Sequence, residues 1–459
     1  MFTVTKSRAV TGLLACSALA LSACSSTTSA AAPPSTTSAA STSTSTTAST
    51  TPTGTTSPTA VEAGKPVKLT WWHNATEDPL KKYWSDEAAA FTALHPNVTF
   101  DIQGIQNEAL QKKINLALQG TPPDIFQQWG GGDLATQQQS GKLMDLTPVI
   151  GDEIKSLGGT AAGWQVDGKQ YGIPWNMGIV GFWYRTDLFA QAGITGAPAT
   201  IDDLYKDVDM LKAKGIAPIA VGGKDKWPEA FYYGYFATRE CATDVLKTAT
   251  LKKDFSAPCL LKAGKDIQDL VGKQPFQKGF LGSPAQQGAV SSAGLIANGR
   301  AAMELQGQWN GAVITSLTPD KKSLGDKLGW FPFPTVPGGA GDPTAQFGGG
   351  DGFSCSATAP PECAQFLKFL LQPDEQKKFG VTGAGLPSIP DAGSSVTDTT
   401  VTPVLKARNG ASFIQLYFDK ALPTAVGNAL NNEVANIFAG SGSPEAIGKA
   451  VADSAAAQK

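Results

Sequence analysis

Tryptophans in this chain repeatedly stand beside a planar polar side chain or a short run of glycines. The flat face of an indole packs well on the apolar C–H face of a sugar ring, and amide and carboxylate groups hydrogen-bond the ring hydroxyls. The sequence therefore predicts a binding cleft with aromatic walls and no catalytic residues. The predicted ligand-binding residues are Trp72, His73, Asn74, Trp129, Asp133, Trp175, Asn176, Trp227, Gln308, Trp309 and Asp351.

An enzyme is the main alternative to a binding protein. A glycoside hydrolase would also use aromatic walls, with two carboxylates, for which Asp351 with Glu304 or Asp133 is the available choice. The sequence holds no H-E-x-x-H, G-x-S-x-G or phosphate-loop motif, and only His73 and His95 supply imidazoles. These observations favour binding over catalysis. A peptide, an amino acid or a polyol stays open as the ligand, although the tryptophan content favours a sugar.

Charge and glycine content narrow the class of ligand. The formal net charge of -2 and the isoelectric point near 5.8 show no basic footprint for nucleic acid. The glycine-rich run 347–353 lacks a following Gly-Lys-Ser/Thr and is not a G-x-G-x-x-G motif. It brings backbone close to a ligand or forms a hairpin turn. We therefore expect a neutral ligand, no cofactor and no metal.

Strands that end at the candidate residues would position them. The alternating segment 67–71 predicts a strand that leads into Trp72, His73 and Asn74, and the helical stripe 80–94 leads into a second strand at 98–102. A later strand, at 125–126, also runs toward a tryptophan and three glycines. The alternation of strands and helices predicts an α/β fold, in which ligands gather at the carboxyl ends of the strands.

Two motifs carry a resemblance to a known family. The stretch from Gln170 to Phe189 places Gly-Ile-Pro-Trp-Asn directly before an apolar, aromatic strand. The run Asn298-Gly-Arg-Ala-Ala-Met-Glu-Leu305, followed by Gln308-Trp309, joins a helix to a strand and a polar loop. Both resemble the bacterial extracellular solute-binding proteins of sugar uptake systems, whose chain crosses between two lobes at the first motif. Taken alone, the first stretch could also be a core strand with buried aromatics.

The resemblance implies an α/β, two-lobed fold of the periplasmic-binding-protein type II, with the ligand cleft between the lobes. It implies the substrate-binding protein of an ABC importer, a monomer that captures a neutral di- or oligosaccharide and delivers it to membrane permease subunits. The motifs around Trp175 and Asp351 resemble xylobiose-type binders, with cello-, malto- and chito-oligosaccharides also open. The expected segments are 65–176 and 326–380 for the first lobe, and 177–325 and 381–459 for the second.

The start of the chain resembles a lipoprotein signal peptide, over residues 1–23. Lys6 and Arg8 precede an apolar run that is too short to span a bilayer, and small residues lead to Cys24. A lipid on Cys24 would anchor the exported protein to the outer face of the cytoplasmic membrane; ordinary secretory cleavage is the alternative. Residues 24–64 are almost entirely Ser, Thr, Ala, Pro and Gly, which predicts a disordered tether.

Four further cysteines, Cys241, Cys259, Cys355 and Cys363, lie in the part of the chain expected to fold. In an exported protein an even set of cysteines is typical of disulfides. Three pairings are possible, and we favour Cys241 with Cys259 and Cys355 with Cys363 because the shorter loops make local staples. A zinc site is the competing interpretation, but the spacings do not match the usual fingers and histidines are few.

Overall fold

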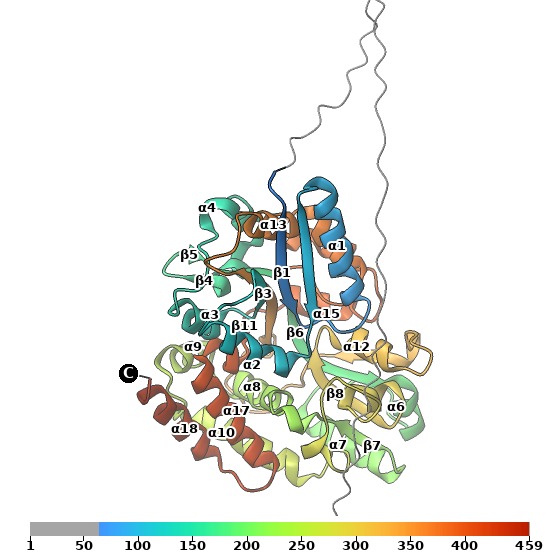
Figure 1. Ribbon diagram of the computed structural model, residues 1–459. Helices are drawn as coiled ribbons and strands as arrows, with labels where there is room; N and C mark the ends of the chain where they lie inside the picture. Colours follow the sequence, from blue (N-terminus) through green and yellow to red (C-terminus); the bar gives the residue numbers. More distant parts are fainter. Residues whose placement is uncertain (1–63, 459) are drawn as a thin grey trace, which may run out of the picture. The chain divides into compact units, whose positions relative to one another are not determined.

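The computed structural model of the chain describes residues 64–458 (Figure 1). The predicted signal peptide 1–23, the lipidated Cys24 and all but the last residue of the tether 24–64 lie outside the described residues. Within residues 64–458, no helix has both the length and the apolar character needed to cross a membrane.

Three parallel strands form one edge of the main sheet. β1 (Val67–His73) pairs with β2 (Val98–Gly104) on one side and with β3 (Ile125–Gln128) on the other. The connecting helix α1 (Leu80–Leu94) packs Trp84 and Phe91 into the core, and α2 (Asn107–Ala117) follows β2. The predicted strands at 67–71 and 98–102 and the predicted helix at 80–94 are therefore confirmed, although β1 continues two residues beyond its predicted end.

Two long antiparallel strands continue the sheet. β6 (Ile173–Arg185) pairs with β10 (Gln346–Cys355), and the strand order is β2-β1-β3-β10-β6-β8-β7. β9 pairs with β6, and β11 pairs with β10 beside this path. The bounds of the remaining strands are Gln165–Val166 for β4, Lys169–Gln170 for β5, Ala217–Ala220 for β7, Ala301–Gly307 for β8, Leu328–Phe331 for β9 and Ile414–Leu416 for β11.

The two long strands run from one hydrophobic core into another. In β6, Ile173 belongs to the core that contains β1 and α1, whereas Phe182 belongs to a second core. In β10, Phe353 lies in the first of these cores and Phe347 in the second. Strands that link two cores are what the predicted crossover between lobes requires. The residue boundaries proposed for the lobes stay a prediction.

Helices cover the two cores. Figure 1 shows α1 and α13 over the part of the sheet that contains β1, and α10, α17 and α18 beyond α8 at the other end. The remaining helices have the following bounds: α3 Gly131–Gln138, α4 Thr147–Ile150, α5 Glu153–Leu157, α6 Thr186–Ala192, α7 Ile201–Ala213, α8 Trp227–Glu240, α9 Thr243–Lys252, α10 Pro258–Gly272, α11 Ser292–Ala297, α12 Asn310–Leu317, α13 Glu362–Leu370, α14 Pro373–Val381, α15 Thr402–Asn409, α16 Phe418–Ala421, α17 Thr424–Phe438 and α18 Pro444–Ala456.

Both favoured disulfides are present. Cys241 pairs with Cys259, and Cys355 pairs with Cys363. The first bond joins the end of α8 to the start of α10, since Cys241 directly follows α8 and Cys259 is the second residue of α10. The second joins the end of β10 to the start of α13. Each disulfide therefore fixes one helix against a neighbouring element.

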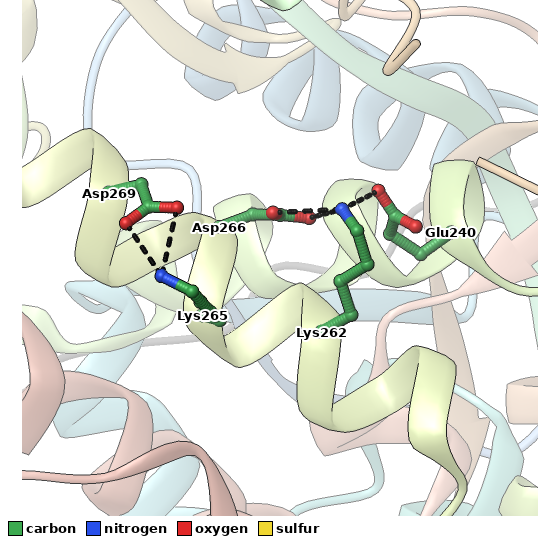
Figure 2. Close-up of polar contacts among 5 residues, drawn as sticks. All are labelled: Glu240, Lys262, Lys265, Asp266 and Asp269. Atoms are coloured by element: carbon green, nitrogen blue, oxygen red, sulfur yellow. Dashed lines mark hydrogen bonds and ion pairs between the residues drawn. The ribbon is translucent and has the colours of Figure 1, made fainter. Parts of the chain in front are cut away.

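A group of ion pairs supports the contact between α8 and α10. Figure 2 shows Lys262 between Glu240 and Asp266, with Nζ 2.6 Å from the nearest Glu240 oxygen and 3.2 Å from the nearest Asp266 oxygen. One turn away, Lys265 pairs with Asp269 at 3.0 Å. Exposed pairs of this kind contribute little, but the Glu240 side chain is only 4% exposed, so Lys262 also neutralises a buried carboxylate.

Candidate ligand-binding site

A cavity of about 170 Å³ lies beside the two long strands. Its lining includes residues one or two positions after the carboxyl ends of β1, β3, β8 and β11, namely Asn74, Trp129, Trp309 and Tyr417. The carboxyl ends of strands are where α/β folds gather ligands. The cavity therefore lies where the fold class predicts a binding site.

Seven of the eleven predicted site residues line this cavity. β6 and β10 add polar side chains from the middle of the sheet, and α8 adds an indole from the second core. Tertiary structure thus brings together residues that are up to 277 positions apart. The seven are Asn74, Trp129, Trp175, Asn176, Trp227, Trp309 and Asp351.

Trp72 and His73 lie outside the cavity lining because β1 extends through both of them. Trp72 is covered by Lys113, whose Nζ lies 3.7 Å from the ring centroid. His73 is buried against Trp71, and its Nδ1 accepts a hydrogen bond from the Ala75 N–H at 3.2 Å. Burial lowers the pKa of His73 to about 4, so this imidazole is neutral at physiological pH.

Asp133 and Gln308 are also outside the lining. Asp133 is buried in the first turn of α3 and accepts a hydrogen bond from the Thr424 hydroxyl, so it ties α3 to α17. Gln308 is fully buried and packs against Gly178, where an added Cβ would lie 2.1 Å from the Gln308 Cδ. A glycine is needed at position 178 for this approach. Both side chains connect elements of the fold beside the cavity.

The aromatic lining differs in how much of each ring reaches the cavity. Trp227 and Trp309 are partly buried, with ring centroids 6.4 Å apart and ring planes 59° apart. Trp175 is only 2% exposed, and it packs against Trp84 and Phe379 in the first core. Trp175 therefore acts mainly in the packing of the first core and offers little of its ring to a ligand. Trp227 and Trp309 retain accessible surface.

Asp351 is the centre of a hydrogen-bonded group on the cavity wall. Its carboxylate accepts from Gln127 Nε2 at 2.9 Å and from Asn176 Nδ2 at 3.2 Å. The other amide atom of Asn176 accepts from the Leu386 N–H at 3.0 Å. Burial raises the pKa of Asp351 to about 6, and the bonds from Asn176 and Gln127 act in the opposite direction. The group links β6, β10 and the segment around Leu386.

Several lining residues escaped the sequence analysis. The sequence analysis singled out neither Phe231 nor the segment that carries Tyr417, Asp419 and Lys420, and all four residues line the cavity. A signal for Tyr417 was nevertheless present, because it follows a strand end just as Trp129 does. Glutamine and asparagine side chains complete the polar lining, at Gln106, Asn107, Gln111, Gln286 and Gln287.

The carboxylates considered for a hydrolase are not assembled around the cavity. Of the three, only Asp351 lines it. Glu304 is buried and accepts hydrogen bonds from the Ser292 hydroxyl and from Asn310 Nδ2, the latter at 2.9 Å. Asp133 is held by Thr424, as described above. Neither pair that the sequence offered for a hydrolase, Asp351 with Glu304 or Asp351 with Asp133, is therefore present in the cavity lining.

Known proteins share this fold and sequence pattern. A structure from a study of xylan utilization by the thermophilic bacterium Caldanaerobius polysaccharolyticus is 27% identical, with a TM-score of 0.77, covering 84% of this chain and 98% of that one. A chitin oligosaccharide binding protein is 26% identical, with a TM-score of 0.74, covering 86% and 99%. The diacetylchitobiose binding protein DasA of Streptomyces coelicolor is 27% identical over 287 residues, 60% of this chain and 62% of DasA.

These neighbours bear out the two-lobed α/β fold of the periplasmic-binding-protein type II that the sequence motifs implied. The two named relatives are binding proteins by name. The sequence profile of the family described as bacterial extracellular solute-binding protein matches residues 74–377, which is well over half of the chain. On the strength of this match and of the cavity at its strand ends, the chain belongs to the bacterial extracellular solute-binding proteins.

Proposed function

We propose that this protein captures a neutral di- or oligosaccharide in the cavity and delivers it to the membrane permease of an ABC importer. The observation that carries the proposal is the lining itself, in which six aromatic side chains stand among amides and carboxylates. Aromatic faces suit the apolar faces of sugar rings, and planar polar groups suit their hydroxyls. The names of DasA and of the chitin oligosaccharide binding protein support a sugar ligand.

Capture would proceed by closure of two lobes around the sugar, with β6 and β10 as the connections that bend. Hinge closure is a common transition in two-lobed binding proteins. We assign residues 65–176 and 326–380 to one lobe and residues 177–325 and 381–459 to the other. Closure would present a different surface to the permease and so report that the site is occupied.

We further propose that a lipid on Cys24 anchors the exported monomer to the outer face of the cytoplasmic membrane. Residues 24–64 would act as a flexible tether that keeps the binding domain near the permease. Metabolic labelling with a radioactive fatty acid tests the anchor: the wild-type chain should take up label, and Cys24→Ala should not. Label on both chains, or on neither, would contradict it.

A thermal-shift screen tests the ligand class. The panel consists of xylobiose, cellobiose, maltose, N,N′-diacetylchitobiose, free amino acids, short peptides and polyols. A ligand that binds the folded state raises the melting temperature by mass action. We expect a shift from one oligosaccharide series, with isothermal titration calorimetry giving a 1:1 complex and chromatography showing the sugar intact. A shift from amino acids, peptides or polyols alone would contradict the proposal, as would hydrolysis of the sugar.

A further inference from the structure

The segment that follows β11 places two opposite charges on the cavity wall. Asp419 and Lys420 both line the cavity, and their side chains are 15% and 13% exposed. The adjoining Tyr417 is anchored in the wall, with its ring stacked on Phe231 at 5.1 Å. Gly349 permits this position, because an added Cβ there would lie 2.5 Å from the Tyr417 ring. The charged pair is therefore held in place by an aromatic neighbour.

Lys420 keeps its hydrogen-bonding capacity free. Among residues 64–458, its one ion pair joins Nζ to Asp419 Oδ2 at 3.8 Å, which exceeds hydrogen-bond length. The ammonium lies over the Trp129 ring, 5.0 Å from its centroid, a favourable contact that supplies no hydrogen-bond acceptor atom. An ammonium group has three N–H donors. Lys420 lines the cavity, and its donors meet no protein acceptor among residues 64–458, so they are available to a ligand that accepts a hydrogen bond there.

The spacing of the two charged groups fits one ligand oxygen. An ammonium can only donate hydrogen bonds and an ionised carboxylate can only accept them, whereas a hydroxyl does both. A hydroxyl oxygen about 2.9 Å from a nitrogen donor and about 2.7 Å from an oxygen acceptor can contact two atoms that are 3.8 Å apart. An ether oxygen would satisfy only Lys420, and a protonated amine would satisfy only Asp419.

The charge of the remaining lining disfavours an anionic partner for Lys420. The other charged lining residues are all acidic: Glu77, Asp78, Asp351 and Asp419. A carboxylate on the ligand would meet this excess of negative charge in a partly enclosed space. The ammonium is thus suited to a neutral acceptor and not to the acid group of a uronic acid.

We propose that Lys420 and Asp419 are specificity-determining residues that hold one hydroxyl of the sugar between them, with the hydroxyl accepting from Lys420 and donating to Asp419. This inference rests on the proposed function and deepens it, since it names the group that the site requires on the sugar. A sugar that lacks this hydroxyl, or carries it as a methyl ether, loses one or both bonds. Discrimination against such analogues then depends on both side chains.

Calorimetry with modified sugars tests the pair. The probes are xylobiose, cellobiose and N,N′-diacetylchitobiose, each with its set of monodeoxy analogues, titrated into the full chain. The variants are Lys420→Met, which keeps an unbranched apolar stem, and Asp419→Ala, which removes both acceptor oxygens. Lys449→Met is the matched control, because Lys449 pairs with Asp453 on the exposed face of α18 and lies outside the cavity lining.

Hydrogen bonds to charged groups correspond to about 10- to 100-fold in affinity. We expect Lys420→Met to weaken binding of the parent sugar by that factor and Lys449→Met to leave it unchanged. The wild type should reject one monodeoxy analogue at least about 10-fold, and both Lys420→Met and Asp419→Ala should lose discrimination against that same analogue. If Lys420→Met does not melt cooperatively, Lys420→Gln replaces it.

The outcomes separate this inference from the proposed function. Unchanged affinity in Lys420→Met contradicts the proposal that Lys420 and Asp419 hold one hydroxyl, but it leaves the proposed function as a sugar receptor intact. Loss of discrimination against different hydroxyls in the two variants also contradicts that proposal, because the pair would then not share one group. If none of the three probes binds the wild type and another class of ligand does, the proposed function fails, and the inference fails with it.

Discussion

The indole nitrogen of Trp227 donates a hydrogen bond to Glu108 Oε1 at 2.9 Å, which joins α8 to α2. The two helices belong to different cores: Trp227 packs against the core that contains Phe182, and the neighbours of Glu108 on α2, Leu110 and Ile114, belong to a small cluster with Phe126. Trp227 also lines the cavity. A bond between two cores beside a binding cavity would hold the cavity closed.

Removing this bond should speed release of the ligand. We expect Glu108→Ala to raise the dissociation rate of the bound sugar by about 10-fold, in the range for a hydrogen bond to a charged group. The association rate should change little, because interface changes act mostly on dissociation. Stopped-flow tryptophan fluorescence measures both rates. Glu108→Gln keeps an acceptor oxygen and should release sugar at nearly the wild-type rate. Equal rates in all three proteins would show that the hydrogen bond between Trp227 and Glu108 does not hold the cavity closed.

Trp175 and Trp309 should respond differently to truncation. Trp175 lies in an aromatic core, so Trp175→Ala should lower the free energy of unfolding by about 3 to 5 kcal/mol. Trp309 is only partly buried at the cavity wall, so Trp309→Ala should weaken sugar binding by about 1 to 3 kcal/mol with a small loss of stability. Urea unfolding and calorimetry on both variants measure the two quantities. A Trp309→Ala variant that is destabilised but binds sugar normally would contradict the assignment of Trp309 to the binding surface.

The regular elements were predictable because their signals are local. The alternation over 67–71 and the apolar stripe over 80–94 each specify one element without reference to the rest of the chain. The end of β1 was less clear from the sequence. Because the strand was predicted to end too early, Trp72 and His73 were predicted to be site residues, and both lie outside the cavity lining. Side chains alternate along a strand, so once β1 includes Trp72 and His73, His73 joins Trp71 in the core and Trp72 faces Lys113.

The charged pair beside Trp129 could not be predicted from local pattern. Asp419 and Lys420 are about 290 residues from Trp129, and they reach the cavity because β11 pairs with β10. A strand of three residues gives a weak pattern, and its pairing partner depends on long-range packing. The disulfides were more accessible to prediction, since short sequence separations already favoured local pairs, and the structure has that one of the three possible pairings of the four cysteines.

Loss of the Cys241–Cys259 disulfide should destabilise the fold without removing the site. The bond closes a loop with a sequence separation of 18, for which the chain-entropy estimate is about 3 kcal/mol. None of the four paired cysteines lines the cavity. We expect the variant with Cys241→Ser and Cys259→Ser to melt several degrees lower and to bind sugar with unchanged stoichiometry. Differential scanning calorimetry and titration calorimetry measure these effects; an unchanged melting temperature would contradict a stabilising bond.

Glu229 should make the protein less stable as pH rises. This side chain is fully buried in the first turn of α8, and neither carboxylate oxygen has a hydrogen-bond partner among residues 64–458. Burial raises the pKa of Glu229 from 4.5 to about 8, with Lys226 acting weakly in the opposite direction. Between these two values the folded state holds a proton that the unfolded state has lost. Stability therefore falls with rising pH, by up to about 1.4 kcal/mol per pH unit from this group.

Glu229→Gln removes this pH dependence, since an amide does not titrate in the range. We expect the stability advantage of Glu229→Gln over the wild type to grow by about 2 to 3 kcal/mol between pH 5.5 and pH 7.5. Urea unfolding at the two pH values measures it. Glu445→Gln is the control, because Glu445 is an exposed residue in the first turn of α18 and its replacement should change stability equally at both pH values. A constant difference between Glu229→Gln and the wild type would show that Glu229 is ionised in the folded protein throughout, with a cation or water compensating its burial.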